Sequence, residues 1–216
     1  MKWNDHSNLR GTHALFSPSK SGWENYSEET MYDRYFGGFA KEIGTVLHLE
    51  AEDRIRYGLR INAGSKNDLK LALYRSIDIP NEVVDELEFE PIFQNVRSYV
   101  NDCIGFRMDP EVILYNNDLC YGCVDAISFN NNFLRIHDLK TGTTPAHIEQ
   151  LFKYAALFCL EYKVNPIDIR SELRIYQLNE VSIYNPEPGD IKDFCDVILK
   201  TKKLSANLAK RRLTNE

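Results

Sequence analysis

The sequence predicts an α/β fold in which helices flank three antiparallel strands, and three observations support this prediction. Residues 121–129 are rich in β-branched and aromatic side chains, three asparagines follow, and residues 133–139 alternate apolar and polar side chains, which is typical of a β-hairpin. Residues 39–57 carry an apolar residue at every fourth position, which marks one face of a helix. A helical pattern over 144–163 precedes a strand pattern over 171–178. A chain of 216 residues can bury a substantial core, so we expect one domain over 1–216.

We expect the N-terminal region, residues 1–38, to be helical. Ser17 followed by Pro18 is typical of an N-cap and a first helical position, so a short helix that carries Trp23 and Tyr26 is expected to begin there. The long helix described above follows, and its apolar face consists of Phe39, Ile43, Leu47, Ala51 and Ile55.

The long helix also carries two side chains that can face one metal ion. His48 and Glu52 are four positions apart and therefore neighbours on one side, and Gly44 lies one turn before the histidine. A histidine beside an apolar stripe is more often a packed core residue, so the helix alone leaves both interpretations open.

Between the long helix and the hairpin, the sequence combines helices with a run of acidic residues. We expect a helix within 64–80, a solvated acidic face over 81–90 and an amphipathic helix over 91–108. A strand at 111–115 then leads into the hairpin. Glu111 would add a carboxylate at the edge of the sheet, although a simple surface acid is the commoner case.

The hairpin brings two aspartates together if its turn has two residues. Asparagine tolerates positive φ, so Asn131 and Asn132 suit a primed turn. Counting outward from that turn places Asp125 opposite Asp138.

This register places like charges together. Opposed carboxylates repel, so it needs a cation, a proton or a basic neighbour, and Lys140 points to the same face. Two oxygen ligands beside a lysine suit Mg²⁺ or Mn²⁺. A longer loop would shift the pairing by one residue, and the alternative is an exposed hairpin with solvated charges.

The helix over 144–163 is expected to begin with Thr144 as its cap and Pro145 at its first position. Gln150 and Tyr154 then lie together near its beginning, close to the end of the preceding strand. A plain surface pair is the alternative interpretation of these two residues.

The C-terminal part is expected to contain a short strand at 181–184 and an amphipathic helix over about 190–210. This helix either contacts a phosphate backbone or is merely solvated, because it ends in a basic cluster of Lys200, Lys202, Lys203, Lys210, Arg211 and Arg212.

Composition limits the classes of protein that fit. The net charge of −6 argues against passive coating of nucleic acid, although a cleft can be locally positive. No apolar run approaches the roughly 20 residues of a membrane span, and the start lacks a signal peptide's apolar region, so we expect a cytoplasmic protein without a membrane partner. Five scattered cysteines suit a reducing compartment, and the CxxC at 120–123 lacks the second pair of a zinc site.

Four short motifs follow one another along these elements: GxxxH at 44–48, GxxD at 122–125, DxK at 138–140 and QxxxY at 150–154. In their order and spacing they resemble the motifs of the PD-(D/E)xK nuclease superfamily, in particular its RecB-like branch with phage exonucleases. The resemblance covers about 39–178 and implies a central mixed sheet with a restriction-endonuclease-like αβββαβ core and additional flanking helices. A relation to lambda exonuclease is an analogy of fold only.

The resemblance implies roles for the residues of these motifs. Lys140 would be catalytic together with Asp125 and Asp138. Gln150 and Tyr154 would position the substrate strand. The implied ligands of Mg²⁺ or Mn²⁺ are His48, Asp125, Asp138 and the Leu139 carbonyl, with Glu52 and Glu111 as further candidates.

The resemblance also implies what cofactors to expect. Relatives with an iron–sulfur cluster carry one cysteine before the first motif and several after the last helix. Here the earliest cysteine is Cys103 and only Cys195 follows Cys159, so we expect no cluster.

The expected function is that of a metal-dependent DNA exonuclease, in phage or mobile-element recombination, repair or DNA processing. The alternatives are a structure-specific or nicking endonuclease with the same site, or a non-catalytic module that binds nucleic acid or protein. DNA is the expected partner, and the analogy allows a single-strand-annealing or recombinase partner and a homo-oligomer. The expected compartment is the cytoplasm of a bacterium or of a phage-infected host cell.

Overall fold

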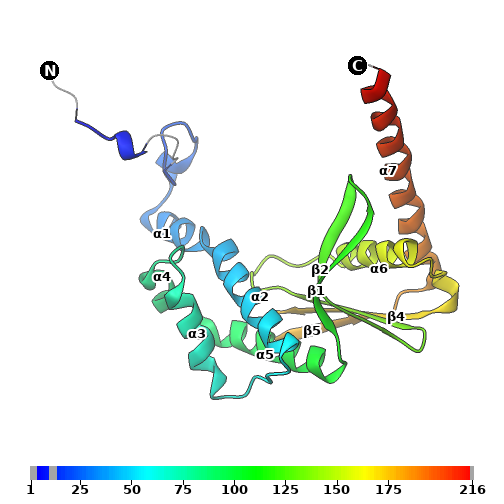
Figure 1. The fold of residues 1–216 in the computed structure, drawn as a ribbon. Coiled ribbons are helices and arrows are strands. Elements are labelled where there is room, and N and C mark those ends of the chain that lie inside the picture. Colours follow the sequence, from blue (N-terminus) through cyan, green and yellow to red (C-terminus); the bar gives the residue numbers. More distant parts are fainter. Residues whose placement is uncertain (1–3, 10–13, 215–216) are drawn as a thin grey trace. The chain divides into compact units, whose positions relative to one another are not determined.

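A five-stranded mixed sheet lies at the centre of the fold in the computed structural model, which describes residues 4–9 and 14–214 (Figure 1). The strands follow one another in chain order across the sheet, and β3 and β4 are parallel while all other neighbours are antiparallel. The predicted α/β fold with a central mixed sheet is therefore confirmed. The strands are β1 (Asp109–Asn117), β2 (Cys120–Asn130), β3 (Phe133–Leu139), β4 (Arg170–Gln177) and β5 (Glu180–Tyr184).

The chain divides into two compact units, residues 1–41 and residues 42–216. The second unit contains the whole sheet and nearly all of the helix α2. Its helices are α2 (Ala40–Arg56), α3 (Ser65–Arg75), α4 (Asn81–Glu86), α5 (Phe89–Gly105), α6 (Glu149–Glu161), the short 3₁₀ helix η3 (Pro166–Asp168) and α7 (Pro188–Thr214).

Helix α2 forms where the period of four predicts it. Its face of Ile43, Leu47, Ala51 and Ile55 is buried, with at most 7% of each residue exposed. Burying such an aliphatic side chain contributes roughly 1.5–3 kcal/mol. This stripe therefore fixes the rotation of α2 about its axis, and with it the direction of His48.

Helices α5 and α6 cover opposite faces of the sheet at β3. Ile136 belongs to the apolar core that also contains Leu151 of α6. Its neighbour His137 contacts Cys103 of α5 instead. Because successive side chains of a strand point to opposite faces, the next residue, Asp138, points away from α5.

In the N-terminal unit, the predicted helix at Ser17-Pro18 is wrong. The described elements are the 3₁₀ helices η1 (Ser7–Leu9) and η2 (Trp23–Asn25) and the helix α1 (Glu28–Gly37). Ser17 begins a turn, in which its carbonyl accepts from the Lys20 N–H, and the left-handed Gly22, with φ of 97°, redirects the chain before a helix can extend. The helix instead begins after Ser27, whose hydroxyl caps the Thr30 N–H at 3.1 Å.

The predicted start of α6 at Thr144-Pro145 is also wrong, because the helix begins at Glu149. The Gln177 side chain on β4 donates to the carbonyls of Gly142 and Thr144 at 2.8 and 2.7 Å, and its oxygen accepts from Ala146 N–H. A glutamine more than thirty residues away thus holds this segment in a non-helical conformation.

The hairpin has the predicted turn. Asn131 and Asn132 have φ of 51° and 55°, and Asn130 pairs with Phe133. The ladder keeps this register as far as the pair Ala126–His137. The expected pair of Asp125 and Asp138 does not form in the ladder, because Asp125 instead turns its carboxylate to the backbone of β3, where it accepts the Leu139 N–H at 2.8 Å.

The remaining predicted elements are present with shifted ends. The acidic residues of 81–90 are exposed as expected, while Val83 and Val84 of α4 are buried. The C-terminal helix is longer than expected and runs from 188 to 214. No helix in the described ranges has an apolar stretch that could cross a bilayer.

Candidate functional site

His48 reaches the end of β3 from helix α2. Its Nε2 lies 3.0 Å from the Leu139 carbonyl oxygen, and its Nδ1 lies 3.6 Å from Asp125 Oδ2 and 4.0 Å from Glu111 Oε1. A carbonyl only accepts hydrogen bonds, so Nε2 carries the proton in the neutral ring and Nδ1 presents its lone pair to the two carboxylates. The Leu139 carbonyl, expected as a metal ligand, is therefore an acceptor for His48.

Three potential ligands from three elements converge at this point. His48, Glu111 and Asp125 each offer an atom, and these atoms lie within 4.8 Å of one another. Glu111 has φ of 51°, a conformation that costs a non-glycine residue roughly 1–2 kcal/mol, and it lies between the ladder pairs Pro110–Ala126 and Val112–Val124. Glu111, which sequence patterns favoured as a surface acid, is thus part of this cluster.

Asp138 and Lys140 form a partly buried pair beside the cluster. Lys140 Nζ donates to Asp138 Oδ1 at 2.9 Å and to Gln150 Oε1 at 3.3 Å. Asp138 is only 2% exposed, and its Oδ2 has no hydrogen-bond partner among the residues that the structure describes. Asp138 is not one of the three converging ligands, but its charge is close enough to act on that of Asp125.

Burial and like charge act on both aspartates. Burial, followed by the charge of Asp125, raises the pKa of Asp138 to about 6, against the opposing effect of Lys140. Burial also raises the pKa of Asp125, while His48 and the Leu139 N–H lower it. The site therefore holds its carboxylates at an electrostatic cost, which a divalent cation would offset.

The two motif glycines are explained by close approach of other side chains. A Cβ on Gly44 would lie 3.1 Å from Thr141 Oγ1, and a Cβ on Gly122 would lie 3.0 Å from Cε1 of Tyr154. Gly44 thus lets the loop after β3 lie against α2, and Gly122 lets the Tyr154 ring of α6 lie against β2. Tyr154 is half-buried, and this burial raises the pKa of its hydroxyl.

The structure also separates one candidate from the cluster. Glu52 forms an ion pair with Arg56, one turn further along α2. It is not among the three converging ligands within the described part of the chain, so Glu52 as a further ligand stays a prediction.

Cys123 is a neighbour of the cluster whose position sequence analysis did not use. Its thiol donates to Glu111 Oε2 at 3.0 Å, and burial followed by this hydrogen bond raises its pKa to about 12. All five cysteines are free thiols. The sequence could have indicated this position, because Cys123 lies two residues before Asp125 and therefore points to the same face of the strand.

The donor set suits a hard divalent cation. Carboxylate oxygens are the ligands that Mg²⁺ and Mn²⁺ prefer, and one imidazole favours Mn²⁺ over Mg²⁺. His48, Glu111 and Asp125 would hold the ion directly, and the orphan oxygen of Asp138 provides a further acceptor beside them.

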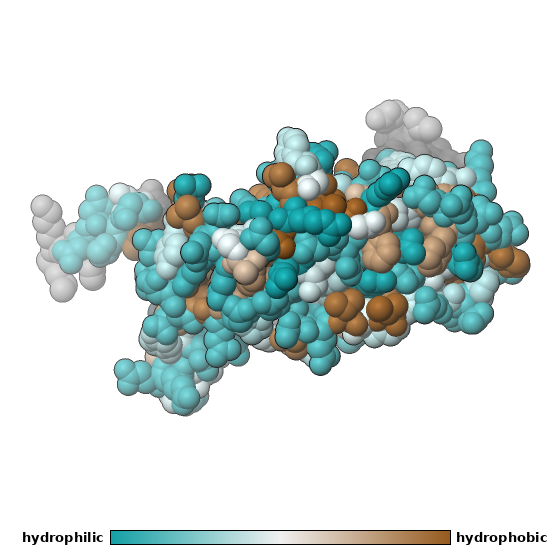
Figure 2. Space-filling view, turned by 90° about the horizontal axis from the view of Figure 1, so that it is seen from below, coloured by the Kyte–Doolittle hydropathy of each residue, from teal (hydrophilic) through white to brown (hydrophobic). Residues whose placement is uncertain are grey.

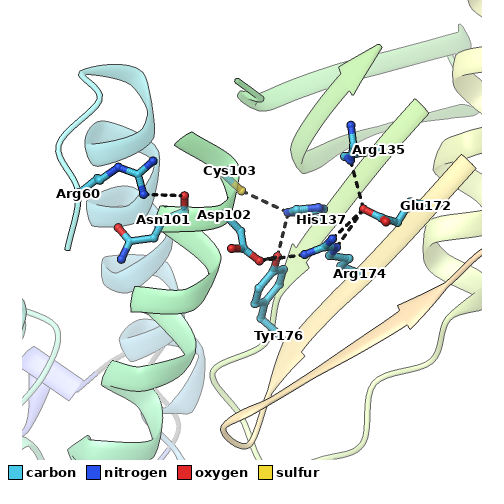
Figure 3. Close-up of polar contacts among 9 residues, drawn as sticks. All are labelled: Arg60, Asn101, Asp102, Cys103, Arg135, His137, Glu172, Arg174 and Tyr176. Carbon is cyan, nitrogen blue, oxygen red and sulfur yellow. Dashed lines mark hydrogen bonds and ion pairs between the residues drawn. The ribbon is translucent and has the colours of Figure 1, made fainter. Parts of the chain in front are cut away.

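A second polar cluster lies on the other face of β3 (Figure 3). We call it the arginine network; it consists of Asp102, Cys103, Arg135, His137, Glu172, Arg174 and Tyr176. Arg174 donates to Asp102 at 2.9 Å and pairs with Glu172 at 3.0 Å, and Glu172 also accepts from Arg135 at 3.2 Å. Each carboxylate of this network therefore has an arginine partner.

His137 is the buried centre of the arginine network. The Tyr176 hydroxyl donates to Asp102 at 2.8 Å, so the His137 Nδ1 at 3.1 Å carries the proton and donates to the tyrosine oxygen. Burial, then Arg174 and Arg135, lower the pKa of His137 to about 3. The ring is therefore neutral, and its Nε2 has no hydrogen-bond partner within the described residues.

Comparison with known proteins adds no family to this description. No protein-family model matches the chain, and no curated protein matches it either. The functional assignment therefore depends on the residues of the site and their arrangement.

Proposed function

We propose that this protein is a metal-dependent DNA exonuclease that hydrolyses phosphodiester bonds. The observation that carries the proposal is the convergence of His48, Glu111 and Asp125 within 4.8 Å, beside the buried pair of Asp138 and Lys140. The proposal places its work in phage or mobile-element recombination, repair or DNA processing. Its compartment would be the cytoplasm of a bacterium or of an infected host cell.

The chemistry follows from the types of residue. A bound Mg²⁺ or Mn²⁺ would polarise a phosphodiester oxygen and lower the pKa of a water molecule. Lys140 would stabilise the charge that gathers on the phosphate or orient the attacking water. Asp138 and Gln150 hold the Lys140 ammonium from two sides, so they fix its position before substrate arrives.

Helix α6 supports the choice of an exonuclease over a restriction-type endonuclease. Gln150 and Tyr154 lie one turn apart on α6. Gln150 accepts from Lys140, directly after β3, and Tyr154 lies against Gly122 of β2. The resemblance gives such a pair the role of positioning the substrate strand. DNA is then the partner, and a single-strand-annealing protein or recombinase would be a further one.

The test measures degradation of end-labelled linear DNA and of covalently closed circles, with Mg²⁺, with Mn²⁺ and with a chelator. Wild type is expected to degrade only linear DNA and only with metal, and Lys140→Ala and Asp138→Ala are expected to be inactive. Lys153→Ala is the matched control, because this lysine is exposed on the same helix as Gln150 and should leave activity unchanged.

The other outcomes each overturn the proposal. Cleavage of closed circles would make the protein a structure-specific or nicking endonuclease with the same site. DNA binding without cleavage by any form would make it a non-catalytic module. Equal activity of wild type and both site variants would mean that the activity is a contaminant or that the site is wrong.

A further inference from the structure

Helices α2 and α3 form a cleft that is separate from the candidate site. Its volume is about 550 Å³. Leu49 and Leu71 line it although they are 57% and 44% exposed, together with the acids Glu50, Asp53 and Asp68 and the base Arg75. Glu50 also forms an ion pair with Arg54, which is not a lining residue, at 3.7 Å. We call the three acids the acidic rim; apolar side chains beside an excess of acids suit a basic, amphipathic segment.

The second half of helix α7 has the complementary character. The buried face of α7 consists of Ile191, Cys195 and Ile198 and does not extend beyond Ile198 in the side chains that are described. Val197, Leu204 and Leu208 are 53%, 53% and 38% exposed, and their spacings of seven and four place them on one side of the helix, which we call the seam. Thr201 lies beside the seam and is held in its own copy, because its hydroxyl accepts from the Asn117 side chain at 2.9 Å. Between residues 200 and 214 the sequence has six basic residues and no acidic one.

We propose that the second half of α7 of one copy docks in the α2–α3 cleft of another copy. The seam would cover Leu49 and Leu71, and the lysines beside it would meet the acidic rim. In Figure 1 the helices α2 and α3 lie at the opposite end of the sheet from α7, so a contact between copies is favoured over one within a copy. Such a contact is head-to-tail.

Charge disfavours the simplest competing contact, the pairing of α7 with α7. Antiparallel overlap of residues 197–208 would bring Lys200, Lys202 and Lys203 of the two copies together, and parallel overlap would align each of these lysines with its own counterpart. Like charges placed in this way cost an interface free energy. Binding of DNA would use the bases alone and would leave the exposed leucines of α7 without a role.

Figure 2 shows a mostly hydrophilic face on which hydrophobic residues form small separate patches. The proposed contact would combine an apolar centre with a polar rim. The contact is therefore expected to weaken as salt screens the charges of its rim.

The experiment measures the size of the full chain by sedimentation, without metal or DNA, for wild type and three variants. The cleft variant is Leu49→Glu with Leu71→Glu, the helix variant is Leu204→Glu with Leu208→Glu, and the control is Ile77→Glu. Ile77 is 98% exposed and lies outside the cleft, so its change adds one negative charge, against two in each site variant, without touching the contact. Circular dichroism checks that each variant is folded.

Wild type and the control are expected to self-associate, and each site variant is expected to weaken association by at least about tenfold. In an equimolar mixture, the intact α7 of the cleft variant can dock in the intact cleft of the helix variant, and no other contact is left. The mixture is therefore expected to form dimers and nothing larger. Loss in the helix variant alone would indicate α7–α7 pairing. A monomeric wild type, or loss of association in the cleft variant alone, would also overturn the proposal.

Discussion

Two adjacent residues of β3, His137 and Asp138, lie at the centres of two polar clusters that differ in charge balance. In the arginine network, two carboxylates, Asp102 and Glu172, are matched by Arg135 and Arg174. In the candidate site, three carboxylates face a single lysine, and an oxygen of a buried aspartate has no partner in the described part of the chain. In the described part of the arginine network, the buried atom without a partner is Nε2 of His137, which belongs to a neutral ring and carries no charge.

The difference is the one expected between a cluster that stabilises the fold and a cluster that, on the proposed function, binds a metal ion. A buried charge with a hydrogen-bonded partner costs little, whereas an unmatched one costs several kcal/mol. Cation–π contacts add to the first cluster, since the Arg135 guanidinium lies 4.4 Å from the Phe106 ring centre and 4.1 Å from that of Phe133. The second cluster keeps its imbalance, and a divalent cation is the partner that would remove it.

The largest expected effect is the loss of activity in Asp125→Asn. Asparagine keeps the size and an acceptor for the Leu139 N–H but removes the ligand charge. A metal ion stabilises transition-state charge by several kcal/mol, so activity should fall by roughly a thousandfold or more. Asp102→Asn is the matched control in the arginine network and should retain activity. If Asp125→Asn and Asp102→Asn lost activity equally, the candidate site would have no role in activity that the arginine network lacks.

The next effect is on stability, in Arg174→Met. This change leaves Asp102 without its arginine and removes one of the two partners of Glu172. Asp102 is 39% exposed, so solvent screening reduces the cost of a broken buried pair to about 2 kcal/mol. Urea unfolding should show this loss, while the activity of the folded fraction changes less than about twofold. An unchanged unfolding midpoint would mean that the network contributes nothing to the fold.

The two clusters should also respond to pH in opposite directions. The pKa of His137 falls from 6.5 to about 3 on folding, so below pH 6.5 the unfolded chain binds a proton that the folded chain does not, and stability falls with falling pH. The pKa of Asp138 rises from 3.8 to about 6, so between these values the folded chain binds the extra proton and stability rises as pH falls. Each effect reaches at most about 1.4 kcal/mol per pH unit.

The measurement is the unfolding free energy of metal-free protein between pH 4 and 6, roughly the window set by these pKa values. Relative to wild type, Asp138→Asn should lose stability more steeply as pH falls, and His137→Gln should lose it less steeply. Curves that run parallel for all three proteins would show that neither residue titrates as stated.

Local chemistry explains why much of the sheet and the site could be predicted from the sequence. The paired asparagines fix the hairpin turn, and the turn fixes the register as far as Ala126 and His137. The period of four fixes the buried face of α2 and therefore the direction of His48. Lys140, Gln150 and Tyr154 lie where motif spacing on the predicted elements places them.

The features that the sequence did not reveal depend on distant contacts or on single backbone angles. Gln177 delays the start of α6, and no local pattern at Thr144 records that contact. Glu111 reaches the site because its backbone is left-handed, with φ of 51°. Glutamate rarely adopts positive φ, so the sequence gives no reason to expect this conformation. Glu52 pairs with Arg56 and is not among the three ligands that converge in the described part of the chain.

The smallest expected effect tests how finely the site is packed, through Gly122→Ala. The new methyl group would lie 3.0 Å from Cε1 and 3.4 Å from the hydroxyl of Tyr154, so the ring has to move by a few tenths of an ångström. Overpacking of this kind costs about 1 kcal/mol, so kcat/KM should fall about fivefold, mainly through KM if Tyr154 positions the substrate. Gly142→Ala is the control, because no atom lies within 4 Å of its added methyl group. If Gly122→Ala matches this control in steady-state kinetics, the contact with Tyr154 serves packing alone, and the positioning of substrate has to be sought in Gln150.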